Sequence, residues 1–192
     1  TWLDRQSDGV NLQSAICNLN SAFPVSDLLP LFPLPSVVLF PGVFLPLHIF
    51  EPRYRDMVAA AIATDRLIGM VLLRDGWDQD YEGRPPVYDI GCSGVITHYD
   101  RLPDGRFNII LRGLDRFRII SEDHDRSYRR ATVQTLIERE PDDRERIALR
   151  DQRARIDALL AQFDSGGRVD TRTTSALNDV DLINALAQYL DL

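Results

Sequence analysis

Lysine is absent from this chain of 192 residues, so all 22 basic side chains are arginines. Without lysine the chain cannot form a Schiff base, a serine–lysine dyad or the lysine-containing phosphate loop of many nucleotide-binding proteins. The formal net charge is -7, and phosphate groups are attracted by positive fields. These features exclude several classes of enzyme and disfavour nucleic acid or an anionic membrane as a partner.

Cysteine and histidine are scarce, which leaves few ligands for a metal. They stand far apart in the sequence: Cys17, Cys92, His48, His98 and His124. The paired spacing of a zinc site is missing, and so are the G-x-S-x-G and H-E-x-x-H motifs. Ser93, between Cys92 and Gly94, superficially resembles a nucleophile, but a strand continues after it, so small residues that let strands approach closely are the better interpretation. We predict no catalytic residue, no metal and no cofactor.

The longest stretch without a charged residue runs from Leu28 to Phe50 and has the length of a membrane span. Five prolines interrupt it, and each would cost about 3 kcal/mol inside a helix. The run therefore predicts short extended segments broken by turns, with no membrane span. Ser36–Phe40, rich in β-branched and aromatic residues, is predicted to be a strand buried on both faces.

The rest of the chain predicts one early helix, then strands, then helices. Pro52 opens a helix with its body over 53–64. The expected strands are 67–73, 90–99, 106–111, 116–121 and 129–138, with a tight turn over 102–105 and another turn over 112–115. A helix is expected to start at 141–143, and a second is expected to be capped by Asn178, with Val180, Ile183, Ala187 and Leu190 on one face. This pattern predicts an α+β, β-rich fold: a mostly antiparallel sheet or open barrel with a small helical appendage at the C-terminus.

The apolar run also supplies the candidate binding residues. Proline-stiffened loops cost little entropy to hold in place, which favours recognition surfaces. We predict a peptide-binding surface formed by Phe32, Phe40, Pro41, Val43 and Phe44. We also expect a structural ion pair at the helix start, among Glu51 and Arg53 and an arginine such as Arg112 or Arg116, with Glu51 as the carboxylate.

Several segments resemble the N-terminal substrate-binding domain of Lon protease. The most specific are 31–35 (LFPLP), 38–42 (VLFPG) and 45–54 (LPLHIFEPRY), with weaker support from 68–71, 90–94 and 105–117. The resemblance implies a PUA-like pseudo-barrel followed by helices, and a role in recognising unfolded substrates. The ATPase and peptidase of Lon reside in other domains, so a stand-alone bacterial Lon-domain protein is expected.

Together these observations predict a non-enzymatic module that binds unfolded or extended polypeptide, or a partner protein, in the bacterial cytoplasm. The expected organisation is an N-terminal extension over 1–24 that is disordered or loosely docked, a β domain over 25–139 and a helical appendage over 140–192. Two alternatives stay open: a PUA-type RNA-binding protein, against which the net charge weighs, and a hydrolase, against which the missing serine–lysine dyad weighs.

Overall fold

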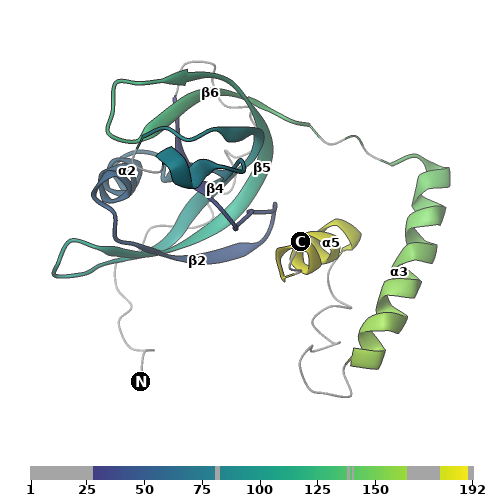
Figure 1. The fold of residues 1–192 in the computed structure, drawn as a ribbon. Coiled ribbons are helices and arrows are strands. Elements are labelled where there is room, and N and C mark those ends of the chain that lie inside the picture. The colour runs from purple at the N-terminus through teal and green to yellow at the C-terminus, as the bar shows by residue number, and fades with distance from the viewer. Residues whose placement is uncertain (1–27, 81–82, 138, 140, 164–177, 190–192) are drawn as a thin grey trace.

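The computed structural model describes residues 28–80, 83–137, 139, 141–163 and 178–189 (Figure 1). The predicted N-terminal extension lies outside the described residues. The elements are β1 (Leu29–Leu34), β2 (Phe44–Ile49), α2 (Pro52–Ile62), β3 (Leu67–Leu73), a short 3-10 helix (Trp77–Asp80), β4 (Val87–Arg101), β5 (Phe107–Asp123), β6 (Arg129–Thr135), α3 (Asp143–Phe163) and α5 (Asp179–Tyr189).

The strands form one sheet that closes on itself through the long strand β5. The sheet order is β2-β5-β4-β3-β1-β6, and β6 also pairs with β5. The first half of β5 pairs with β2, and its second half pairs with β6 from Phe117 to Asp123. All pairings are antiparallel except β1 with β3. The predicted β-rich α+β fold with mostly antiparallel strands is therefore confirmed.

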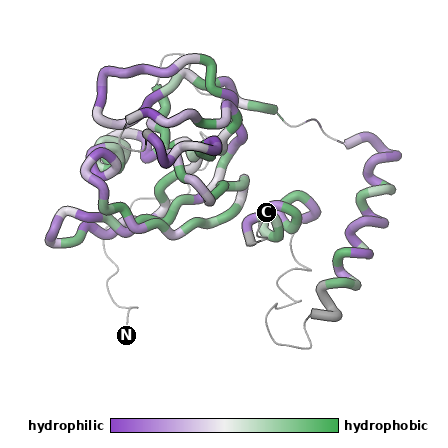
Figure 2. Tube along the Cα trace, viewed as in Figure 1, coloured by the Kyte–Doolittle hydropathy of each residue, from purple (hydrophilic) through white to green (hydrophobic). Residues whose placement is uncertain are grey.

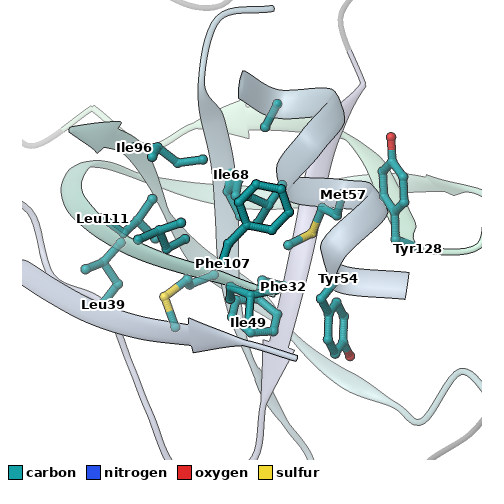
Figure 3. Packing of buried hydrophobic residues seen from close by; sticks show 14 of the residues in the cluster. Phe32, Leu39, Ile49, Tyr54, Met57, Ile68, Ile96, Phe107, Leu111 and Tyr128 are labelled. Atoms are coloured by element: carbon teal, nitrogen blue, oxygen red, sulfur yellow. The ribbon is translucent and has the colours of Figure 1, made fainter. Parts of the chain in front are cut away.

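Helix α2 packs against the sheet, and its Tyr54 and Met57 contribute to the main core (Figure 3). Met57 and Val58 are fully buried. The rings of Phe32 and Tyr54 meet with their centroids 4.6 Å apart. A second cluster around Leu31 and Phe117 fills the other part of the barrel. Burial of each such side chain contributes about 1.5–3 kcal/mol, so these two clusters hold the strands in register.

One predicted strand and one predicted turn are wrong. Ser36–Phe40 is not a strand and is exposed or half-buried except at Leu39, because this segment crosses over neighbouring strands and does not pair within the sheet. The turn predicted over 112–115 is also absent, since β5 continues through Gly113. Near Gly113 the β4–β5 pairing has a register shift, between Cys92 and Gly94 of β4.

Helix α5 begins at the predicted cap. Asn178 Oδ1 accepts a hydrogen bond from the Asp181 backbone N–H at 2.8 Å. Of the residues expected to share one face, Val180 and Ile183 are 52% and 47% exposed, whereas Leu182, outside that set, is 1% exposed. The face is set by a tertiary contact that local periodicity does not contain: the Asn184 side-chain amide donates to the Pro41 carbonyl at 3.1 Å.

Helix α3 stands to one side of the barrel, and apolar and polar residues alternate along it (Figure 2). Its Arg153 bridges to α5 through the Asp179 carboxylate at 3.0 Å. Ile147 and Leu159 on α3 are mostly exposed. In the described part of the chain, no helix combines the length and apolar character needed to cross a membrane.

Candidate functional site

The connection between β1 and β2 is held against the barrel at two glycines. A Cβ on Gly113 would overlap the carbonyl group of Phe40, and a Cβ on Gly94 would lie 2.9 Å from Leu39 Cδ2. The Gly42 N–H donates to the Gly113 carbonyl at 3.0 Å, and the Gly113 N–H donates to the Val43 carbonyl at 2.9 Å. Leu39 is therefore fixed in the core at 2% exposure, which holds the residues beside it in defined positions at the surface.

An apolar groove lies beside this connection. Its volume is about 270 Å³, and it is lined by Val37, Val38, Met70, Val71, Leu72, Tyr88, Ile90 and Gly91. Three side chains from two segments are open to solvent: Val38 is 44% exposed, Tyr88 45% and Ile90 39%. The Arg74 guanidinium lies 5.2 Å from the centre of the Tyr88 ring and helps to hold it in place. We call these eight residues the apolar groove.

The outward side of β2 presents a second apolar surface. Phe44 is 54% exposed, and Phe50, just beyond the strand, is 60% exposed. The Arg112 guanidinium lies 5.9 Å from the centre of the Phe44 ring. Between the two phenylalanines, His48 Nδ1 lies 2.7 Å from Asn108 Oδ1. Among the described strands β2 pairs with β5 alone, so its other edge can offer main-chain hydrogen bonds, although Pro46 lacks a donor.

The residues that could suggest catalysis have structural roles. Ser93 is fully buried, and its hydroxyl donates to the Asp115 carbonyl at 3.1 Å and accepts from the Asp115 N–H at 3.2 Å. Burial raises the pKa of the Cys92 thiol to about 12, so it is not a nucleophilic thiolate at neutral pH. Within the described residues, no group of three or more His, Cys, Asp and Glu side chains could hold a metal ion.

Comparison with known proteins agrees with this arrangement. A family model described as the ATP-dependent protease La (LON) substrate-binding domain matches residues 28–191. The chain belongs to this family. It is 28% identical over 180 residues to Lon protease of Flavobacterium johnsoniae, which covers 90% of this chain and 21% of that protein. It is 32% identical over 179 residues to Lon protease of Paraburkholderia phytofirmans, covering 88% and 21%.

A solved structure supports the fold. The N-terminal domain of Mycobacterium avium complex Lon protease superposes with a TM-score of 0.62 at 18% identity, covering 84% of this chain and 80% of that one. The resemblance to the Lon substrate-binding domain is thus confirmed in sequence and in fold. The chain spans about a fifth of the length of the curated Lon proteases described above.

Within this Lon substrate-binding domain, the five predicted peptide-binding residues occupy different environments. Phe32 and Val43 are core residues, 5% and 8% exposed. Phe40 and Pro41 are half-buried, and Pro41 is also contacted by α5. Only Phe44 is open to solvent. We therefore take Phe44 forward and leave Phe32 and Val43 out of the proposed surface.

Sequence reasoning missed the other wall of the apolar groove. The expected strand over 90–99 includes Ile90 but not Tyr88, whereas β4 begins at Val87. The alternation of Tyr88 and Ile90 with Asp89 is a signal that could have placed both apolar side chains on one face. Their approach to Val38 depends on the path of the β1–β2 connection, which no local pattern contains.

Among the four residues of the predicted ion pair, Glu51 and Arg53 lie in contact with each other. Arg53 Nε lies 3.0 Å from Glu51 Oε2, and the same guanidinium lies 4.8 Å from the centre of the Tyr54 ring. Arg112 instead lies over Phe44. Arg116 stands opposite Cys92 on β5, and its carbonyl accepts the Leu136 N–H. The Glu51–Arg53 pair lies at the start of α2.

Proposed function

We propose that this chain is a non-enzymatic recognition module that binds extended, unfolded polypeptide through the apolar groove, with Phe44 as a further contact. The proposal is supported by membership of the Lon substrate-binding domain family. The observation that carries it is the groove itself, whose exposed Val38, Tyr88 and Ile90 come from two segments with a fixed backbone. Unfolded chains expose apolar side chains that a native surface hides, so such a groove distinguishes the two states.

The physical properties of the groove suit weak and general binding. Burying one apolar side chain contributes roughly 1.5–3 kcal/mol, and two or three such contacts must offset the cost of ordering an extended segment. The expected affinity is therefore modest, and it depends little on sequence. Because the walls are aliphatic and aromatic, we expect preference for segments rich in Leu, Phe and Val.

The arginines of the barrel do not favour a nucleic-acid surface. Several of them are paired with a carboxylate, as in the pairs Arg106–Asp104, Arg118–Asp89, Arg129–Glu122 and Arg130–Asp123. Counterion release on nucleic acid requires basic groups that are available to phosphates along a stripe. This supports polypeptide over RNA as the partner.

The proposal includes the absence of peptidase and ATPase activity in this chain and a bacterial cytoplasmic location. The residues that could suggest a nucleophile, Ser93 and Cys92, are buried and serve packing. We propose the domain organisation given above: a barrel unit over 25–139 that binds polypeptide, and a helical unit over 140–192. Any hydrolysis of substrate would then require another protein or another domain.

The experiment is a titration of the purified chain with a permanently unfolded test protein, reduced and alkylated, that carries a fluorophore. Val38→Ser and Tyr88→Ser together are expected to weaken binding by about tenfold to a hundredfold, because each removes about 1 kcal/mol or more of apolar contact. Ile147→Ser on α3, also exposed, is the matched control and should bind as the wild type does. Equal affinity of the double variant and the control would contradict the proposed site.

A further inference from the structure

A second cavity lies on another part of the barrel and shares no lining residue with the apolar groove. Its volume is about 230 Å³, and it is enclosed by the start of α2, the ends of β1 and β3, residues 83–85 and the β5–β6 loop. Four guanidinium groups line it: Arg53, Arg84, Arg126 and Arg129. Such a concentration of arginine is unexpected in a chain with a net charge of -7.

Two of the four positive charges are neutralised. Arg129 makes two hydrogen bonds to the Glu122 carboxylate, at 2.7 and 2.8 Å, and a third to the Pro85 carbonyl at 2.6 Å. Arg53 pairs with Glu51 at 3.0 Å. These two arginines form walls of the cavity with their charges already compensated.

The other two guanidinium groups have no carboxylate partner in the described part of the chain. Arg84 donates only to backbone carbonyls, those of Asp123 at 3.2 Å and Arg126 at 3.3 Å. These bonds fix the position of its guanidinium and leave its charge in place. The Arg126 side chain, on the β5–β6 loop, is exposed and has no partner among the described residues.

The nearby carboxylates do not remove this positive charge. Asp123 is engaged by Arg130, with both of its oxygens 2.8 Å from Nη2. Asp56 accepts a hydrogen bond from the Ser127 hydroxyl at 3.3 Å, but its carboxylate does not line the cavity. Asp125, next to Arg126, is exposed, and among the described residues no Asp or Glu side chain lines the cavity.

Besides Gly83 and Ser127, the remaining walls are apolar or aromatic: Pro33, Tyr54, Leu73, Pro85 and Tyr128. A ligand that fills the cavity should therefore combine one anionic end with a small apolar body. Guanidinium groups hold planar oxyanions with charge-assisted, often bidentate hydrogen bonds. Inorganic phosphate would compensate the positive charge of the arginines but would make no apolar contact with these walls.

We propose that this cavity binds a carboxylate attached to a small apolar group, with Arg84 and Arg126 as the residues that hold the carboxylate. Two sources share this chemistry, the C-terminal residue of a polypeptide and a free organic acid. The inference does not depend on the apolar groove, and either site can exist without the other.

The test uses N-acetyl-L-leucine and its carboxamide, which differ only in the charged group. Binding is followed by chemical-shift changes in proton–nitrogen NMR spectra of the full chain. The acid should bind saturably, and the amide at least tenfold more weakly. Arg126→Gln should weaken binding of the acid about tenfold, whereas Arg150→Gln on the exposed face of α3 should not change it. Arg84→Gln also removes the hydrogen bonds to the Asp123 and Arg126 carbonyls. Its affinity for the acid is therefore interpreted together with its thermal unfolding midpoint.

Two further arms identify the source and the ligand class. A hexapeptide ending in a free leucine is compared with the same peptide amidated at its C-terminus. Tight binding of the free peptide alone assigns the site to polypeptide C-termini, whereas binding of acetyl-leucine without either peptide assigns it to free acids. Equal affinity for acid and amide, no saturable binding, or tighter binding of inorganic phosphate than of the acid would overturn the proposal. None of these outcomes bears on the groove, because the Val38→Ser and Tyr88→Ser variants test that site separately.

Discussion

Gly113 and Phe40 meet where the β1–β2 connection crosses β5, and a Cβ on Gly113 would overlap the Phe40 carbonyl. Gly113→Ala should therefore force backbone movement and lower the free energy of unfolding by about 1–3 kcal/mol, as for other overpacked sites. Urea denaturation measures the loss. Ser121→Ala, at an exposed position on the same strand, is the control. Unchanged stability of Gly113→Ala would mean that the connection is not held tightly against β5.

Truncation of Phe44 and truncation of Phe32 should lower the free energy of unfolding by very different amounts. Phe44 is 54% exposed and Phe32 is 5% exposed. Phe44→Ser should change the free energy of unfolding by less than about 1 kcal/mol, whereas Phe32→Ala should cost about 3–5 kcal/mol. Chemical denaturation of both variants makes the comparison. A large loss in Phe44→Ser would place its ring in the core.

The Cys92 thiol makes stability depend on alkaline pH. Burial raises its pKa from 9.0 to about 12, so above pH 9 the unfolded chain loses this proton while the folded chain keeps it. The protonated thiol therefore contributes to the free energy of unfolding. This contribution is complete below the thiol pKa of the unfolded chain and is lost as pH rises towards the thiol pKa of the folded chain. In a Cys17→Ser background, stability should fall between pH 9 and 11, and Cys92→Ala should reduce that fall.

The same thiol should be protected from alkylation. At pH 8, iodoacetamide should react with folded Cys17→Ser protein much more slowly than with the urea-unfolded form, because the thiol is both inaccessible and protonated. Mass spectrometry of timed samples gives both rates. Similar rates would show that β4 opens readily around Cys92.

The start of the folded domain is a further prediction. A chain beginning at Val25 should keep its unfolding midpoint within a few degrees of the full chain, because loosely tied termini tolerate truncation. Differential scanning calorimetry of the two chains checks this. A larger drop would place part of residues 1–24 in contact with the domain and move the boundary.

Local chemistry was enough to predict many elements. Strand β3 has the predicted bounds, Pro52 opens α2, and Asn178 caps α5. The hairpin turn has the expected bonds, since the Gly105 N–H donates to the Leu102 carbonyl at 2.9 Å. Each of these features depends on residues within one turn or strand, so the sequence pattern carries the necessary information.

The failures occur where distant segments decide the outcome. Ser36–Phe40 has strand-forming residues, but it forms a connection that packs closely against Gly94 and Gly113 and is not a strand. The buried face of α5 depends on the Asn184–Pro41 contact, between residues far apart in the chain. Closure of the barrel depends on the second half of β5 and β6. The groove and the arginine-lined cavity both combine such segments, which is why only one predicted peptide-binding residue, Phe44, remains at an open surface.

The most direct test of the account is a comparison of one protein in two states. The chain is titrated with a small disulfide-bonded protein in its native form and in its reduced, alkylated and unfolded form, with affinity measured by fluorescence anisotropy. The account predicts saturable binding of the unfolded form, weakened by Val38→Ser with Tyr88→Ser, and no measurable binding of the native form. Equal binding of both forms, or binding of neither, would contradict the claim that this chain recognises unfolded polypeptide.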